Sequence, residues 1–157
     1  MRFRHTFRVN ATLEQVAAFH RDPIALACLT PPPLSIRWLH REPVAEGARV
    51  RFVLQWGPIA IPWEAEHREV SITGFVDEQV KGPFRRWIHH HRFREIAPGV
   101  TEIVDEIEAA LPRHPLRAPV ALAIWLGLPF LFAYRARATR RALQATSREE
   151  KSPCASW

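Results

Sequence analysis

The chain has 157 residues, of which 47% are hydrophobic and 24% are charged, proportions typical of one folded globular domain with its own core. Its net charge of +6 comes mostly from arginine, but it has no phosphate-binding glycine loop, zinc-finger spacing or aromatic–basic RNA motif. This argues against nucleic-acid binding. The two cysteines, Cys28 and Cys154, lie far apart. Their spacing argues against a disulfide framework or a cysteine-based zinc site and suits a reducing cytoplasm.

The first two elements follow from hydrophobic periodicity. Residues 2–9 alternate between apolar and arginine-rich positions, which predicts a half-buried strand. The stretch "NATLEQVAAFHRDP" then changes to a helical period, and Gln15 follows Thr12 by three residues, as in a capping box. Pro23 ends this helix. A second short helix is expected at about residues 23–29.

Extended segments separated by short turns occupy the middle of the chain. Such short connections predict antiparallel hairpins. The last third, beginning at "LRAPVALAIWLGLPF", reads as one long helix, and residues 147–157 read as a disordered tail after a domain of residues 1–146. The architecture is therefore α+β: a curved antiparallel sheet around a C-terminal helix, with two short helices after the first strand. The six middle strands are expected at about 34–42, 48–56, 60–70, 73–80, 84–95 and 101–110.

The apolar part of the C-terminal helix has two interpretations. Residues 118–134 carry no charge and arginines follow them, so the run approaches, but does not reach, the length of a membrane span. Pro119, Gly127 and Pro129 weaken that interpretation. A core helix held by the sheet is favoured, and peripheral contact with lipid through this helix and its arginines stays open.

The stretch "GPFRRWIHHHRFRE" packs three consecutive histidines into a predicted strand. Successive side chains of a strand point to opposite faces. His89 and His91 therefore share the apolar face, while His90 lies among arginines on the other. The same alternation places His5, His67 and Asp105 on the apolar faces of their strands.

The register of the last hairpin can be estimated from its "APG" turn. If the turn centres near Pro98, His91 lies opposite Asp105 and Phe93 lies opposite Ile103, with directly paired Cβ atoms about 5 Å apart. A buried carboxylate needs a partner, and an imidazole beside it has its pKa raised or its tautomer fixed. A slip of one residue would break this pair.

Three interpretations of these inward polar groups remain. A zinc site would need three or four converging ligands, and His-x-His on a strand is a weak signal for one, so no metal or cofactor is assigned. An acid–base pair of His91 and Asp105 is chemically sensible in an apolar pocket. The favoured interpretation is that these groups satisfy one another or orient the polar end of a ligand.

The motifs together resemble a known superfamily over about residues 3–143. The pattern runs "FHRDP…LTPPP", then "WGP…W.A.H", then "F.D.Q..GPF..W.H.H.F", followed by Asp105, "LP" and a closing "YR" helix. It is similar to a bacterial branch of the START-like or SRPBCC superfamily, also described as polyketide cyclase/dehydrase and lipid-transport-like proteins. One departure is Ala109-Ala110, where the branch often has an aromatic residue before "LP".

The resemblance implies a helix-grip fold of seven strands around a long C-terminal helix, with an internal cavity for an apolar ligand. Members of the superfamily include lipid carriers, hormone receptors and aromatic cyclases, and relatives of this branch also occur beside a sugar-epimerase-like domain. Fold alone does not assign function.

We therefore expect a carrier or sensor that binds a small apolar molecule or lipid. The alternatives are a cyclase or dehydratase-like enzyme that uses His91 and Asp105, and a membrane-peripheral protein. Trp38 and Trp56 are further candidates for the cavity wall. The candidate ligand-binding residues are Trp63, His67, Phe75, Trp87, His89, His91, Phe93 and Asp105.

Overall fold

The computed structural model describes residues 1–146 of the chain. Its seven strands form one antiparallel sheet in the order β1-β7-β6-β5-β4-β3-β2, which confirms the expected α+β helix-grip fold. The expectation of a disordered tail at 147–157 lies outside the described residues. The elements are β1 (Arg2–Val9), α1 (Leu13–Arg21), α2 (Ala25–Cys28), β2 (Leu34–His40), β3 (Arg49–Trp56), β4 (Ile59–Ser71), β5 (Gly74–Lys81), β6 (Arg86–Ala97), β7 (Val100–Ala110) and α3 (Ala118–Thr146).

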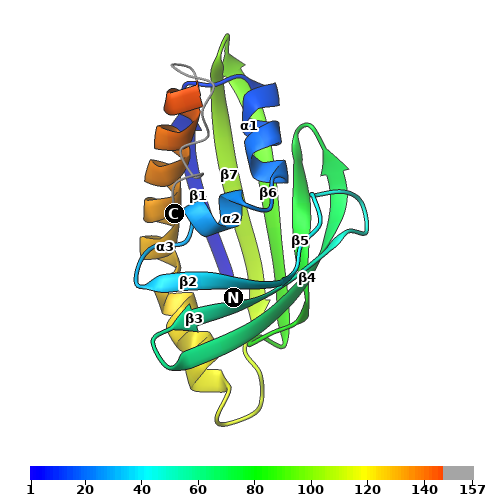
Figure 1. Ribbon diagram of the computed structural model, residues 1–157, viewed down its shortest axis with the longest axis vertical. Coiled ribbons are helices and arrows are strands. Elements are labelled where there is room, and N and C mark those ends of the chain that lie inside the picture. The colour runs from blue at the N-terminus through cyan, green and yellow to red at the C-terminus, as the bar shows by residue number, and fades with distance from the viewer. Residues whose placement is uncertain (147–157) are drawn as a thin grey trace.

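The sheet curls around the long helix (Figure 1). Helix α3 runs along the molecule beside β1, and β2 and β3, from the other end of the sheet, cross in front of it. Helices α1 and α2 lie over the upper part of the concave face.

Helix α1 begins as its sequence predicts. The Thr12 hydroxyl accepts a hydrogen bond from the Gln15 backbone N–H, and the Gln15 side chain accepts one from the Thr12 backbone N–H. This capping box satisfies two N–H groups that the first turn leaves without a helical partner. The helix turns Val16 and Ala17 inward, onto the sheet.

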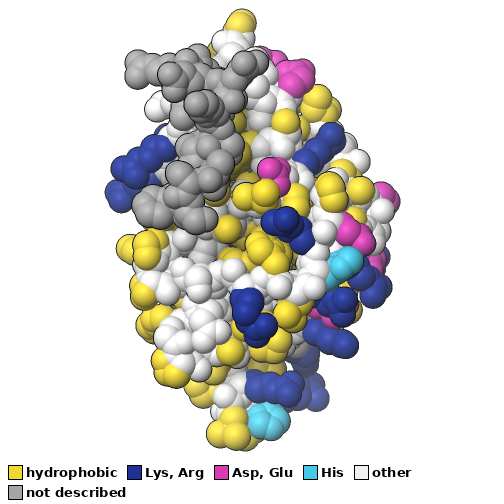
Figure 2. Space-filling model, viewed as in Figure 1, with side chains coloured by type: hydrophobic (Ala, Val, Ile, Leu, Met, Phe, Trp, Pro, Cys, Tyr) yellow, Lys and Arg dark blue, Asp and Glu magenta, His cyan; other side chains and the backbone are white. Residues whose placement is uncertain are grey.

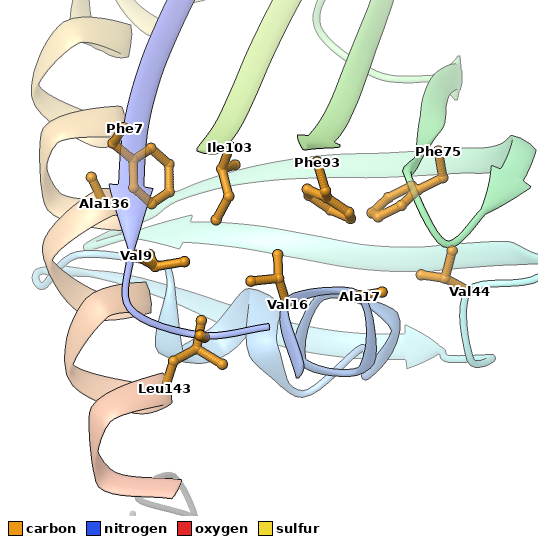
Figure 3. Close-up of a cluster of buried hydrophobic side chains, with 11 residues drawn as sticks. Phe7, Val9, Val16, Ala17, Val44, Phe75, Phe93, Ile103, Ala136 and Leu143 are labelled. Atoms are coloured by element: carbon orange, nitrogen blue, oxygen red, sulfur yellow. The ribbon is translucent and has the colours of Figure 1, made fainter. Parts of the chain in front are cut away.

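The upper end of the molecule is a closed hydrophobic core (Figure 3). Phe7, Phe93 and Ile103, from three strands of the sheet, point toward Val16 of α1. The last turns of α3 also contribute to this cluster, through Ala136 and Leu143. This packing holds α1 against the sheet, so the concave face is filled at this end and open space is left further along α3.

Helix α3 is buried on one face only. Ala121, Leu128, Phe132 and Ala136 recur at helical spacing and are all less than 5% exposed, as expected for a stripe packed on a sheet. The helix is continuous through Pro129. By length and composition, Ala118–Gln144 could cross a membrane, with a mean hydropathy of 1.5 and only 17% of the most apolar window buried. The expectation of a core helix therefore holds for one face of α3 alone.

Candidate functional site

A cavity of about 180 Å³ lies between the concave face of the sheet, helices α1 and α2, and α3. Its wall is mostly apolar, as is usual for sites that bind small molecules. Figure 2 shows hydrophobic side chains reaching the surface among basic ones in the middle of the face that carries α2. The apolar wall includes Leu26, Leu29, Leu54, Trp63, Trp87 and Phe132.

Most of the residues expected to bind a ligand line this cavity. Six of the eight do so: Trp63, His67, Phe75, Trp87, His89 and His91. The other two lie behind the wall. Asp105 holds the histidines from β7, and Phe93 belongs to the hydrophobic core of Figure 3. Trp38 also lines the cavity, whereas Trp56 is 54% exposed at the end of β3.

The strand register places the inward histidines as the alternation predicted. His91 pairs with Asp105 and Phe93 with Ile103 across β6 and β7. His89 is only 4% exposed, and His90 lies on the opposite face of the strand, paired with Glu106. The predicted pairing of His91 with Asp105 is thus confirmed at the level of the backbone.

The side chains extend this pair into a chain of five groups across β4, β5, β6 and β7. At one end, Asp77 Oδ1 accepts a bond from His67 Nδ1 at 2.5 Å, and its Oδ2 lies 3.1 Å from His91 Nε2. At the other end, Asp105 Oδ1 lies 3.0 Å from His89 Nε2. His91 Nδ1 is 3.1 Å from the same Asp105 oxygen, within ion-pair distance but not aligned for a hydrogen bond.

His91 is the cation of this chain. Burial acts to lower its pKa, but contact with Asp105 and Asp77 outweighs burial and raises the pKa to about 9. The proton therefore stays on His91 at neutral pH, between two carboxylates. Both carboxyl groups keep pKa values below their ordinary range: burial opposes ionisation, and the hydrogen bonds from the histidines overcome it.

The neighbouring imidazoles are neutral. Burial, followed by the charge of His91, lowers the pKa of His89 to about 4, and the same two causes lower the pKa of His20 on α1 to about 4. At neutral pH His89 and His20 are therefore uncharged, while His91 keeps its proton between the two aspartates. Arg135 of α3 brings a further positive charge to the cavity wall.

Two polar groups on the wall have bonding capacity left for a ligand. His67 Nε2 is buried and has no hydrogen-bond partner among residues 1–146, while its Nδ1 is fixed by Asp77. Arg135 donates from Nε to the Leu29 carbonyl at 3.3 Å and stacks over Phe132. No carboxylate of the described residues forms an ion pair with it, and burial lowers its pKa.

Sequence reasoning left the orientation of Asp77 open and missed Arg135 and His20. Asp77 has the same strand parity as Phe75, but the alternation of this strand is not clear-cut, and its pairing with His67 depends on the β4–β5 register. Arg135 lies in α3 directly after the apolar residues 118–134, whose pattern does not indicate which side of the helix faces the cavity. His20 is fixed by helix packing, with Nδ1 2.9 Å from the Val16 carbonyl. The expected inward residue His5 packs against Phe132 and does not line the cavity.

Three side chains of the five-membered polar chain lie close enough together to be considered as ligands of a metal ion. Asp77, His89 and His91 each have a potential ligand atom, and these atoms lie within 4.8 Å of one another. One nitrogen of His89 is already bonded to Asp105 and one of His91 to Asp77, and zinc would have to displace the proton that His91 keeps. The donor set therefore fits a hydrogen-bonded chain better than a metal centre.

The comparisons with known proteins identify the fold. No family model matches the sequence, and neither does any curated protein. Among solved structures, the Zhui aromatase/cyclase from Streptomyces sp. R1128 is similar with a TM-score of 0.75 and 13% identity, over 97% of this chain and 98% of that one. A START superfamily protein from Mycobacterium smegmatis is similar with a TM-score of 0.63 and 14% identity, over 92% and 98%.

A third similar structure is longer than this chain. It is the nucleoside-diphosphate sugar epimerase from Corynebacterium glutamicum, with a TM-score of 0.67 and 25% identity. The match covers 93% of this chain but 30% of that one. Together, the cavity beneath the sheet and these similarities give the chain a START-like, SRPBCC-type helix-grip fold, in agreement with the resemblance of its motifs.

Proposed function

We propose that the protein binds a small apolar molecule that carries one polar group. The cavity between sheet and helix supports this, because its wall is built of aromatic and aliphatic side chains. Its volume of about 180 Å³ lies below the ~300–1,000 Å³ of sites for drug-sized ligands. A ligand of one or two rings, or a short acyl chain, suits this space.

The polar end of the ligand would meet His67 and Arg135. Both line the cavity, and each has hydrogen-bonding capacity that the described residues do not use. A buried polar group without a partner costs about 1–3 kcal/mol, so a ligand that bonds to His67 Nε2 recovers part of this cost. The two positions would orient the ligand, and the aromatic wall would supply the apolar contact.

A fluorescence titration tests this proposal. The neutral two-ring probe 1-naphthylamine, whose emission shifts to shorter wavelengths in apolar surroundings, should bind the native protein. Leu26→Trp should fill part of the cavity from α2 and weaken binding at least tenfold. Leu39→Trp is the matched control, because Leu39 is 56% exposed on β2 and does not line the cavity. Equal binding by both variants, or no binding by the native protein, would refute the proposal.

A second candidate function is acid–base catalysis, in line with a cyclase or dehydratase. The observation that favours it is the hydrogen bond that His67 Nδ1 donates to Asp77, which leaves Nε2 as a fixed base toward the cavity. A carboxylate that orients an imidazole in this way is a common arrangement in general base catalysis. His91 suits the role less well, because carboxylates lie against both of its nitrogens.

Exchange of protons α to a ketone tests for such a base. In D₂O, the protein should accelerate the exchange of the α-protons of 2-tetralone, as His67 takes a proton and a deuteron returns from solvent. We expect His67→Gln to abolish the acceleration and His40→Gln, an exposed control with a carboxylate partner of its own, to retain it. Exchange that is unaffected by His67→Gln would remove the assignment.

A further inference from the structure

The outer face of α3 is apolar and exposed over four turns. Leu126 is 70% exposed, Phe130 is 71% exposed and Leu122 is 41% exposed. Pro119, Ala123 and Ala133 are also exposed on this side, and together these six residues define what we call the α3 outer face. Contiguous exposed apolar surfaces on a folded protein mark sites of interaction.

Packing inside the protein does not explain this surface. The opposite stripe of α3, which includes Leu128 and Phe132, is the one that packs toward the sheet and the cavity. A helix that only had to cover the sheet would carry polar residues on its outer side. The outer face therefore indicates contact with something outside the described part of the chain.

The excess positive charge of the protein is concentrated on the same segment. Residues 1–110 contain fourteen basic and fourteen acidic residues, whereas residues 111–146 contain six arginines and no acidic residue. Arg135 turns toward the cavity. The other five flank the apolar face in sequence, with Arg113 and Arg117 before it and Arg137, Arg140 and Arg141 after it.

These arginines differ from those of the sheet in their partners. Most arginines of the strands pair with glutamates, as in Arg2 with Glu108 and Arg94 with Glu102. By contrast, the side chains of Arg113, Arg117, Arg137 and Arg141 form no hydrogen bond or ion pair within residues 1–146. A row of apolar side chains with free guanidinium groups at both ends complements a surface that is apolar inside and anionic outside.

We propose that α3 docks on an anionic phospholipid membrane through this outer face. The helix lies in the plane of the surface, with Leu122, Leu126 and Phe130 among the acyl chains and the arginines on the lipid phosphates. The helix does not span the bilayer, because its other face remains packed on the sheet. The apolar part from residue 119 to 133 is about 21 Å long at 1.5 Å per residue.

Vesicle flotation tests the proposal independently of cavity binding. The native protein should float with vesicles of phosphatidylcholine and phosphatidylglycerol in 50 mM salt, and much less with phosphatidylcholine alone or in 0.5 M salt. The double variant Leu126→Ser/Phe130→Ser should reduce the bound fraction at least tenfold. Leu39→Ser is the apolar control, since Leu39 is exposed on β2.

The charges are tested in the same assay. Arg137→Gln/Arg141→Gln should weaken binding to anionic vesicles severalfold and flatten its salt dependence, whereas Arg37→Gln/Arg51→Gln, on exposed positions of β2 and β3, should change neither. Circular dichroism checks that each variant is folded. If the protein does not float with anionic vesicles at low salt, or if the Leu126/Phe130 variant still floats, the proposal is overturned. It is also overturned if the native protein is a dimer that this change dissociates, since the face would then bind a second copy.

Discussion

His91 holds two aspartates of neighbouring strands in one polar chain. Asp77 comes from β5 and Asp105 from β7, on either side of β6, and each approaches one nitrogen of the imidazole. Without this proton both carboxylates would lose their charged contact with His91. The residue therefore stabilises the cavity wall directly, whatever the ligand.

The pKa of His91 predicts how stability depends on pH. Its pKa of about 9 lies above the ordinary value of 6.5, so its contribution is full below pH 6.5 and is lost as the pH rises through about 9. On the acid side, His89 and His20 have pKa values of about 4, so stability is also lost as the pH falls from 6.5 to 4. Urea unfolding should show maximum stability near pH 6.5.

A substitution isolates the contribution of His91. His91→Gln should lower the free energy of unfolding at pH 6.5 by about 3 kcal/mol, as expected when one partner of a buried pair is removed. The decline in the free energy of unfolding between pH 6.5 and 9 should be absent from this variant. His90→Gln, on the other face of the strand, is the control. A decline that persists in His91→Gln would show that another group causes it.

The polar chain was only partly predictable from sequence. The pairing of His91 with Asp105 followed from a compact turn and strict alternation between them. The pairing of His67 with Asp77 did not, because the β4–β5 register shifts between Arg68 and Ser71. Glu69 has a positive φ of 53° in this irregular stretch, and no residue in the stretch is of a type that predicts a bulge.

Among the elements, β5 and β6 approach closely at Gly74. This residue has a φ of +144°, and a Cβ built on it would lie within van der Waals overlap of the His91 carbonyl oxygen. The backbone of β6 cannot withdraw without disturbing its pairing with β7. A glycine is therefore required where β5 begins.

Two glycine substitutions should have opposite effects. Gly74→Ala should lower the free energy of unfolding by more than about 2 kcal/mol, because the left-handed conformation and the clash both oppose the methyl group. Gly127→Ala should raise it by up to about 1 kcal/mol, because alanine favours the helix interior and the added Cβ meets no atom within 4 Å. Thermal unfolding of both variants checks this, and a neutral Gly74→Ala would contradict the close approach.

Elements were more predictable than their orientation. The capping box of Thr12 and Gln15 and the hairpin turns placed helices and strands close to their observed bounds. The rotation of α3 was not predictable, because residues 118–134 are apolar on every side and give no amphipathic pattern. Its inward stripe, and with it Arg135, is set by contact with the sheet.

In the molecule as a whole, helix α3 forms part of two different surfaces. Its inner side closes the cavity through Ile124, Leu128 and Phe132, and its outer side carries the exposed apolar residues proposed to meet lipid. A probe that is merely apolar could bind at either surface. Affinity alone therefore does not identify the site, whereas the position of the bound probe does.

A crystal structure of the protein with bound 1-naphthylamine would show which of the two surfaces holds the probe. We expect the naphthalene ring beneath α2, among Trp63, Trp87 and Phe132, with His67 and Arg135 within reach of the probe's amine end. A probe found only on the exposed side of α3, or no probe in the interior at saturating concentration, would contradict the claim that this fold encloses a binding site for a small apolar molecule.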